Sequence, residues 1–121
     1  MSKRILVIED TEDNRQIIRD LLTSAGYEMI EALDGEQGVA MAAEHRPDLI
    51  LMDVQLPVLD GYEATRRIKA NPALRHIPVI AVTSYALSGD EEKTRAAGCD
   101  AYVAKPFSPR LLLAKVREFL E

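Results

Sequence analysis

The strongest constraint on the fold is a short apolar run, Leu49–Met52, which lies between Asp48 and Asp53. An unbroken run of this length is typical of a strand that is buried on both faces inside a parallel sheet. Pro57 and Gly61 then indicate a loop. Asp53 therefore falls at the carboxyl end of a buried strand, which is where open α/β sheets bind their ligands.

Similar apolar runs alternate with helical patterns along the whole chain. The other expected strands are 3–8, 28–32, 78–82 and 100–104, and the expected helices are about 13–25, 34–44, 62–70, 90–97 and 109–120. Strict alternation with short connections predicts a doubly wound α/β fold, in which helices cover both faces of a five-stranded parallel sheet. The strand order 2-1-3-4-5 is expected by analogy with flavodoxin-like proteins and not from the alternation itself.

The helices carry recognisable ends and apolar stripes. Thr11 or Asp13 is expected to cap the first helix, Gly26 to end it, and Ser108 to cap the last. The apolar stripes are Ile17, Ile18, Leu21, Leu22 and Ala25 in the first helix, and Leu112, Leu113, Val116, Phe119 and Leu120 in the last. The polar fourth helix, 90–97, should be the least firmly held.

Composition restricts the classes of partner. The 121 residues suit one domain, 1–121, and the formal net charge of -5 gives no reason to expect binding to nucleic acid or to an anionic membrane. No apolar run approaches the roughly 20 residues that span a bilayer. The apolar run Ile5–Ile8 is too short for a secretion signal, which favours the cytoplasm. The single Cys99 excludes an internal disulfide.

Parallel strands all end at one edge of the sheet, so this edge collects the polar residues that follow the strands. These are Glu9 and Asp10 after the first strand, Asp53 after the third, Thr83 after the fourth and Lys105 after the fifth. Three carboxylates resist joint ionisation, and a divalent cation removes the conflict. Oxygen ligands without thiolate or histidine suit Mg²⁺, and Mg²⁺ beside an ammonium suits a phosphoryl group. Asp53 is then the expected nucleophile.

Each of these residues alone has a simpler explanation. The acidic pair could cap a helix, Asp53 could cap a loop, and Thr83 could be an ordinary strand residue. Lys105 alone would most often be a surface lysine. Their joint placement on four strand ends favours the functional interpretation, since no structural requirement demands that set. His45 and His76 are expected to be surface residues.

The motifs together resemble the receiver domain of two-component response regulators. They are Val-Ile-Glu9-Asp10, Leu-Met-Asp53-Val-Gln-Leu-Pro-Val-Leu-Asp-Gly61, Ala-Val-Thr83-Ser84 and Ala-Tyr102-Val-Ala-Lys105-Pro106. The resemblance implies that Asp53 accepts a phosphoryl group from a phosphohistidine of a histidine kinase or a histidine-phosphotransfer protein. It implies Mg²⁺ held by Asp10, Asp53 and the backbone carbonyl of Gln55, with Glu9 acting mainly through water.

The same resemblance implies a switch. Thr83 and Lys105 would contact the phosphoryl oxygens, Tyr102 would turn inward when Thr83 moves, and a downstream protein would bind the face of helix four, strand five and helix five. A cis bond is expected between Lys105 and Pro106. Tyr85 stands where many members carry alanine, so it could alter the phosphoryl lifetime.

Two other interpretations stay open at this point. A Mg²⁺-dependent phosphohydrolase could also use an aspartyl phosphate, but such enzymes carry a second aspartate two residues after the nucleophile, where this chain has Gln55. A receiver excised from a hybrid kinase would have the same motifs. Because no output domain is present, the chain looks like the stand-alone members, which are regulators rather than enzymes.

Overall fold

The computed structural model describes residues 3–83, 90–105 and 108–121. Strands and helices alternate along the chain, as the sequence predicts. The strands are β1 (Arg4–Ile8), β2 (Glu28–Ala32), β3 (Leu49–Asp53), β4 (Val79–Thr83) and β5 (Ala101–Ala104). The helices are α1 (Glu12–Ser24), α2 (Gly35–His45), α3 (Gly61–Ala70), α4 (Asp90–Ala97) and α5 (Pro109–Leu120).

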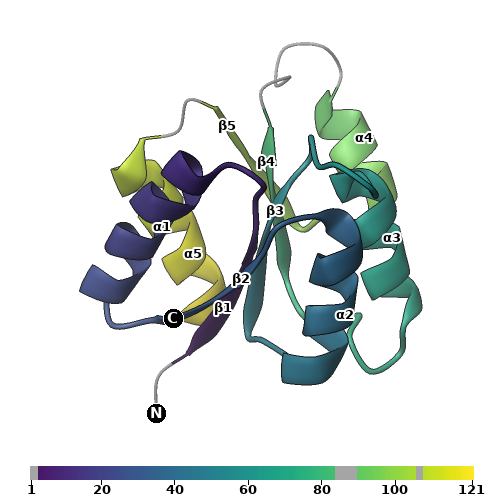
Figure 1. Ribbon diagram of the computed structural model, residues 1–121, viewed down its shortest axis with the longest axis horizontal. Coiled ribbons are helices and arrows are strands. Elements are labelled where there is room, and N and C mark those ends of the chain that lie inside the picture. Colours follow the sequence, from purple (N-terminus) through teal and green to yellow (C-terminus); the bar gives the residue numbers. More distant parts are fainter. Residues whose placement is uncertain (1–2, 84–89, 106–107) are drawn as a thin grey trace.

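The five strands form one parallel sheet in the order β2-β1-β3-β4-β5, which confirms the predicted flavodoxin-like topology. Helices α1 and α5 cover one face, and α2, α3 and α4 cover the other (Figure 1). The chain order reverses between β1 and β3, whose register pairs Ile8 with Met52. This reversal leaves the carboxyl ends of β1 and β3 side by side, which positions the acidic residues that follow them.

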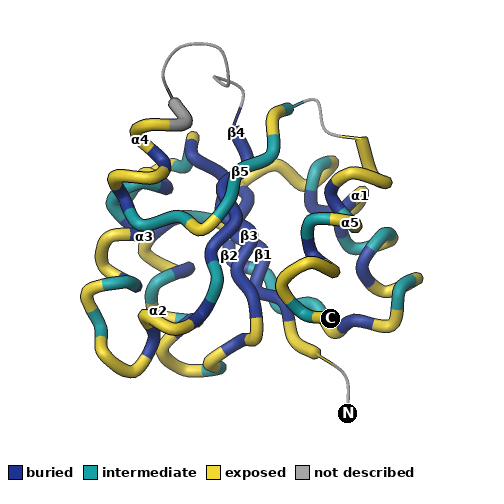
Figure 2. The backbone as a smooth tube through the Cα atoms, turned by 180° about the vertical axis from the view of Figure 1, so that it is seen from behind, coloured by how far each residue is buried: buried dark blue, intermediate teal, exposed yellow. Residues whose placement is uncertain are grey.

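Alternate residues of the central strands supply two separate cores, one on each face of the sheet. Under α1 and α5 lie Ile5, Val7, Leu49, Leu51 and Ile80, and under α2 and α3 lie Leu6, Ile8, Ile50, Met52 and Val79. All of these side chains are buried, and the strands run as dark segments through the middle of the fold in Figure 2. Burial on both faces explains why these strands are continuous apolar runs.

Two predicted core residues lie at the surface instead. Ile17 is 48% exposed and Phe119 is 36% exposed, whereas Ile18 and Leu22 of α1 are buried. The apolar stripe of α1 is wider in sequence than the face that the sheet covers, so Ile17 turns toward solvent. Of the two histidines, His76 is exposed as predicted, and His45 is half-buried.

Helix ends follow the predictions in position but only partly in chemistry. Thr11 and Ser108 occupy the N-cap positions, yet neither makes a side-chain capping hydrogen bond among the described residues. Asp34 does cap α2, since its side chain accepts a hydrogen bond from the Gln37 amide. Gly26 ends α1 with a φ of 90°, a left-handed conformation that glycine adopts without steric cost.

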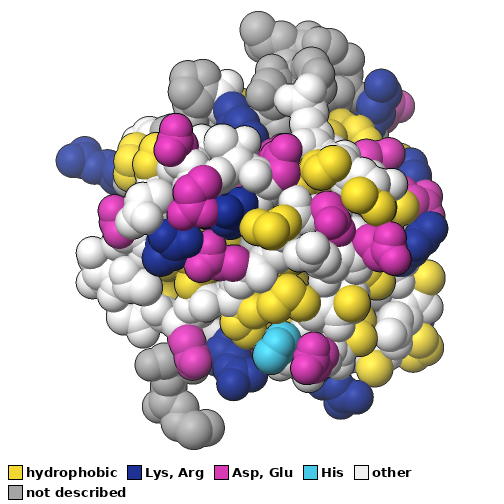
Figure 3. Space-filling view, in the orientation of Figure 1, with side chains coloured by type: hydrophobic (Ala, Val, Ile, Leu, Met, Phe, Trp, Pro, Cys, Tyr) yellow, Lys and Arg dark blue, Asp and Glu magenta, His cyan; other side chains and the backbone are white. Residues whose placement is uncertain are grey.

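No helix within the described ranges is long and apolar enough to cross a membrane. On the face drawn in Figure 3, acidic and basic side chains are interspersed. This mixture fits the modest net charge of -5.

Lys69 and its hydrogen-bond acceptors, here called the lysine clamp, lie at the edge of the sheet where the strands begin. The acidic residues lie at the opposite edge, where the strands end. The Lys69 ammonium donates to the carbonyls of Arg75 and Ile77 at 3.1 and 2.8 Å and to the Asp100 carboxylate at 3.0 Å. The same Asp100 oxygen accepts a hydrogen bond from the Val79 amide at 2.8 Å. One cation therefore joins the end of α3 to the starts of β4 and β5.

We expect Lys69→Met to lower the free energy of unfolding by about 1–3 kcal/mol, because two carbonyls and a carboxylate lose their donor. Urea unfolding measures this change. Lys115→Met is the matched control, since Lys115 makes one ion pair with Glu118 and its side chain is 36% exposed, against 19% for Lys69. The control should change stability by less than about 1 kcal/mol. Equal losses in both variants would contradict the clamp.

Candidate functional site

Asp53 is the last residue of β3, and its side chain is held at the carboxyl edge of the sheet. The residue is 4% exposed. One carboxylate oxygen, Oδ1, accepts a hydrogen bond from the Gln55 amide at 3.0 Å, and Oδ2 lies 3.1 Å from the Lys105 ammonium. Main chain and side chain thus fix both oxygens of the carboxylate.

Glu9 follows β1 directly and lies beside Asp53. It is 3% exposed, and its amide donates to the Ala32 carbonyl of β2 at 3.1 Å. Its Oε1 accepts from the Thr11 amide at 3.3 Å and from the Asn14 side chain at 3.0 Å. Its Oε2 lies 3.4 Å from the Lys105 ammonium. Lys105 therefore faces two carboxylates at once.

Asp10 completes an acidic cluster and is the exposed member of it. One carboxylate oxygen from each of Glu9, Asp10 and Asp53 lies within 4.8 Å of the others. These oxygen donors match the ligands that Mg²⁺ prefers, and the exposure of Asp10 leaves room for the waters that Mg²⁺ retains. The residues present therefore fit a Mg²⁺ site, in agreement with the sequence prediction.

The electrostatics of the cluster show why a cation is favoured there. Burial, followed by the hydrogen bond and charge of Glu9, raises the pKa of Asp53 from 3.8 to about 7. Burial opposes ionisation of Glu9 as well, but hydrogen bonds with Asp53 and Asn14 and the charge of Lys105 hold its pKa below its ordinary value. Burial also opposes the charge of Lys105, and Asp53 and Glu9 outweigh it, so its pKa is raised. Without metal, Asp53 is therefore harder to ionise than an ordinary carboxyl group, and Glu9 is easier to ionise.

Thr83 and Tyr102 lie outside this cluster but on neighbouring strands. Thr83 is the buried last residue of β4, and its carbonyl accepts a hydrogen bond from the Lys105 amide at 2.7 Å. Tyr102 lies on β5, pairs in register with Ala81 of β4 and is half-buried. The predictions for Tyr85 and for a cis bond between Lys105 and Pro106 concern positions outside the described residues.

Gly61 allows α3 to begin against the Asp53 main chain. A Cβ at this position would lie 2.3 Å from the Asp53 carbonyl oxygen, which is far inside contact distance. The Gly61 amide donates to the Val54 carbonyl at 2.9 Å, and Asp60 caps the helix through the Glu63 amide. A glycine is therefore required here by close approach to the strand that carries Asp53.

Sequence reasoning missed two residues that support the acidic pair. Asn14 holds the Glu9 carboxylate, and Arg15 donates to the Glu9 backbone carbonyl at 2.8 Å. Both lie on the first turns of α1, five and six residues after Glu9. The sequence does show that both residues follow an acidic pair at a strand end. Polar residues at the start of a helix are more often solvated, however, so this position alone does not predict contact with Glu9.

Comparison with known proteins agrees with this site. Residues 5–117 match the response regulator receiver domain, and the chain belongs to that family. It is 47% identical over 120 residues to the polar-differentiation response regulator DivK of Brucella anthropi, covering 99% of this chain and 98% of DivK. DivK of Brucella abortus is 46% identical over the same length.

Solved structures of receivers superpose closely. The receiver domain of the sensor histidine kinase PA1611 from Pseudomonas aeruginosa, which has a magnesium ion coordinated in its active-site cleft, is 43% identical with a TM-score of 0.92, and 98% of each chain is covered. A putative response regulator from Chloroflexus aurantiacus is 28% identical with a TM-score of 0.95, and 99% of this chain and 98% of that chain are covered.

The fold, the acidic cluster and the family together define the protein as a phosphoacceptor regulator of two-component signalling. Mg²⁺ is its cofactor, and Glu9, Asp10 and Asp53 form the acidic site for it. Receiver domains act with histidine kinases, so the chain has a histidine kinase partner. It is a regulator rather than a classical enzyme, which removes the phosphohydrolase alternative.

Proposed function

We propose that Asp53 is the phosphoacceptor and receives its phosphoryl group from a phosphohistidine on a histidine kinase or a histidine-phosphotransfer protein. The observation that carries the proposal is the position of Asp53: it is buried at the end of β3, with Lys105 at 3.1 Å and the other two carboxylates within 4.8 Å. This is the only described site where an ammonium and three carboxylates converge.

The transfer is an in-line displacement at phosphorus. An oxygen of the ionised Asp53 carboxylate forms the new O–P bond, while the P–N bond of the phosphohistidine breaks and its electron pair stays on the imidazole nitrogen. When bound, Mg²⁺ neutralises charge on the carboxylates and on the phosphoryl oxygens. Besides Asp10 and Asp53, we propose the Gln55 backbone carbonyl as a ligand, with Glu9 acting through water.

Two further residues receive the phosphoryl oxygens. Lys105 already faces Asp53 Oδ2 and can shift its hydrogen bonds to the new dianion. Thr83 is buried one residue beyond Val82, which pairs with Asp53 across β3 and β4. We propose that its hydroxyl donates to a phosphoryl oxygen, as the family pattern implies.

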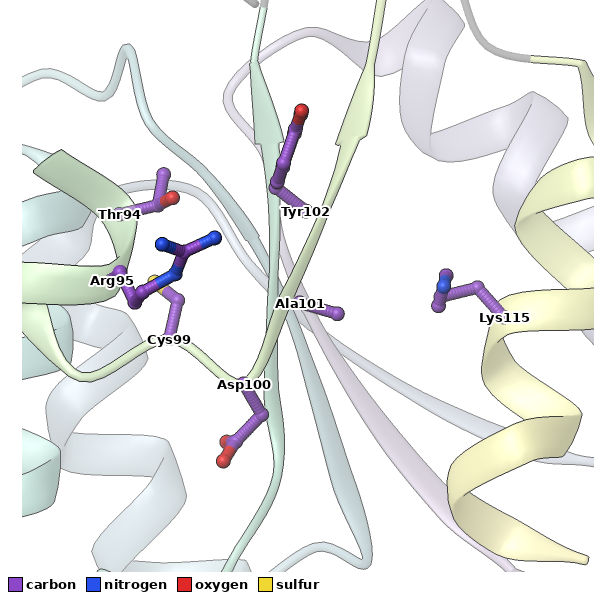
Figure 4. Close-up of a pocket in the computed structure, with 7 residues that line it drawn as sticks. All are labelled: Thr94, Arg95, Cys99, Asp100, Ala101, Tyr102 and Lys115. Carbon is purple, nitrogen blue, oxygen red and sulfur yellow. The ribbon is translucent and has the colours of Figure 1, made fainter. Parts of the chain in front are cut away.

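We propose that the new hydrogen bond of Thr83 changes the shape of the face formed by α4, β5 and α5. Figure 4 shows Tyr102 on β5 between Arg95 of α4 and Lys115 of α5. These residues line a hollow of about 280 Å³, and a second hollow of about 470 Å³ lies between β5 and α5. Helix α4 has eight residues, and Thr94 and Ala97 are its buried described residues, so it can shift at small cost. We propose that a downstream protein binds this face.

Residues 1–121 are proposed to act as a single receiver domain. The support is the similarity to DivK, which extends over 99% of the chain.

The switch is tested with beryllofluoride, a phosphoryl mimic, and Mg²⁺. In the native chain we expect amide chemical shifts to change near Asp53 and also across residues 90–105. In Thr83→Ala, the changes near Asp53 should persist and those at Tyr102 should be lost. Couplings of this kind are typically about 1–3 kcal/mol, so a partner that discriminates the two states should lose about 5- to 150-fold of its preference.

Thr65→Ala is the matched control for this experiment. Thr65 is also fully buried, and its hydroxyl donates to the Gly61 carbonyl at 2.7 Å within α3. This variant should keep the response at Tyr102. Responses at 90–105 that are equal in Thr83→Ala and in the native chain would exclude the Thr83 switch.

A further inference from the structure

Arg15 is a buried cation that lies next to the acidic cluster. The proposed phosphoryl transfer uses the cluster but not Arg15. Its side chain is only 9% exposed, although it lies on the first turns of a surface helix. Arginine is rarely buried unless its donors are paired, since an unpaired buried charge is very costly. The partners of Arg15 therefore indicate what the burial accomplishes.

Three partners surround the Arg15 guanidinium. One terminal nitrogen donates to the Glu9 backbone carbonyl at 2.8 Å. The Nε atom lies 3.2 Å from Glu31 on β2, and the other terminal nitrogen contacts Glu12 at the start of α1. The planar fork thus connects the end of β1, the start of α1 and the neighbouring strand.

The Glu9 carbonyl, which accepts the hydrogen bond from Arg15, lies between two residues of the acidic cluster. It belongs to the peptide unit that joins Glu9 to Asp10, and the carboxylates of both residues belong to the acidic cluster. A peptide unit is planar, so a hydrogen bond that orients its carbonyl also orients the bonds to the two flanking Cα atoms. Holding this one oxygen therefore restricts the directions in which both side chains leave the main chain.

We propose that Arg15 is a positioning residue that presets the Glu9–Asp10 peptide unit, so that both carboxylates are directed at Mg²⁺ before the metal binds. The inference rests on the Mg²⁺ site described above. Arg15 contacts the Glu9 backbone carbonyl and no carboxylate of the acidic cluster among its described partners, so in this role it acts through the main chain. Supporting contacts of this kind typically change metal affinity by about 10- to 100-fold when they are removed.

The chain offers a matched control in Arg19. Its guanidinium also pairs with Glu31 and Glu12, and its remaining described contact is with Gln16. Arg15→Met and Arg19→Met make the formal net charge more negative by the same single unit. Both variants disturb the same ionic network, but only Arg15→Met removes the hydrogen bond to the Glu9 carbonyl.

Calorimetric titration with Mg²⁺ shows whether Arg15 positions the Glu9–Asp10 peptide unit or contributes to stability alone. We expect the dissociation constant to rise about tenfold or more in Arg15→Met and by less than about threefold in Arg19→Met. In the metal-free proteins, amide hydrogen exchange at Asp10 and Thr11 should be faster in Arg15→Met than in Arg19→Met. This second measurement does not depend on metal or on phosphorylation.

Equal dissociation constants in the two variants would overturn the inference and assign the burial of Arg15 to stability alone. If Arg15→Met does not fold, the pair Arg15→Lys and Arg19→Lys decides in the same way, because lysine keeps the charge but loses the fork. A native chain that does not bind Mg²⁺ would instead contradict the magnesium site itself.

Discussion

Asp53→Asn is expected to reduce phosphorylation of the chain by acetyl phosphate in Mg²⁺ by about a thousandfold or more, because the variant has no nucleophilic carboxylate at the end of β3. The fold should persist. The amide oxygen of asparagine can still accept the hydrogen bond from the Gln55 amide, and one carboxylate fewer lies in the buried cluster. Intact mass spectrometry measures the phosphorylated fraction directly.

Asp60→Asn provides the matched control in the same loop. Asp60 is exposed and caps α3 through the Glu63 amide, a role that asparagine also fills. Phosphorylation should therefore be unchanged in this variant. An acid- and alkali-labile phosphoryl group that persists at full stoichiometry in Asp53→Asn would assign the phosphoacceptor to another residue.

The parts of the fold that the sequence predicted share a physical cause. Strands such as Leu49–Asp53 are buried on both faces, so their burial requires a continuous apolar run, and such a run is visible without a structure. Once the strands are parallel, the residues that follow them must meet at one edge. Glu9, Asp10, Asp53 and Lys105 could be brought together on that argument, and the structure confirms it.

The features that the sequence did not predict depend on how elements face one another in the folded chain, which local sequence patterns do not show. Ile17 belongs to an apolar stripe, but the sheet covers only part of that stripe. Arg15 acts on a backbone carbonyl, and no side-chain pattern marks which carbonyl needs a donor. The clamp between Lys69 and Asp100 joins residues 31 positions apart, so it becomes visible only when β4 and β5 are paired.

The acidic cluster should make the stability of the metal-free chain fall as pH rises from about 5 to about 8. The pKa of Asp53 is raised to about 7 in the folded chain, whereas the carboxyl group of an unfolded chain titrates near 3.8. Over this window the folded chain holds a proton that the unfolded chain has lost, so rising pH favours unfolding. The lowered pKa of Glu9 acts in the opposite direction, but mainly below about pH 5.

Mg²⁺ should reverse this trend, because the metal takes the place of the proton that Asp53 holds in the folded chain. At 100 times its dissociation constant, a ligand of the folded state raises the free energy of unfolding by about 2.7 kcal/mol. We expect a gain of this size at pH 8 and a much smaller gain at pH 5, where the metal competes with a proton on Asp53. Thermal or urea unfolding with and without Mg²⁺ at the two pH values measures both gains.

Two variants distinguish the effect of the Asp53 proton on stability from the effect of Mg²⁺. Asp53→Asn removes the group with the raised pKa, so its metal-free stability should no longer fall between pH 5 and 8. Asp10→Asn should keep that fall, but it should weaken Mg²⁺ binding at least about tenfold, because a ligand is lost. Asp13→Asn, an exposed acid in the first turn of α1, should change neither. Stabilisation by Mg²⁺ that is equal at both pH values, or that survives undiminished in Asp10→Asn, would show that the metal binds elsewhere than at the carboxylates of Glu9, Asp10 and Asp53.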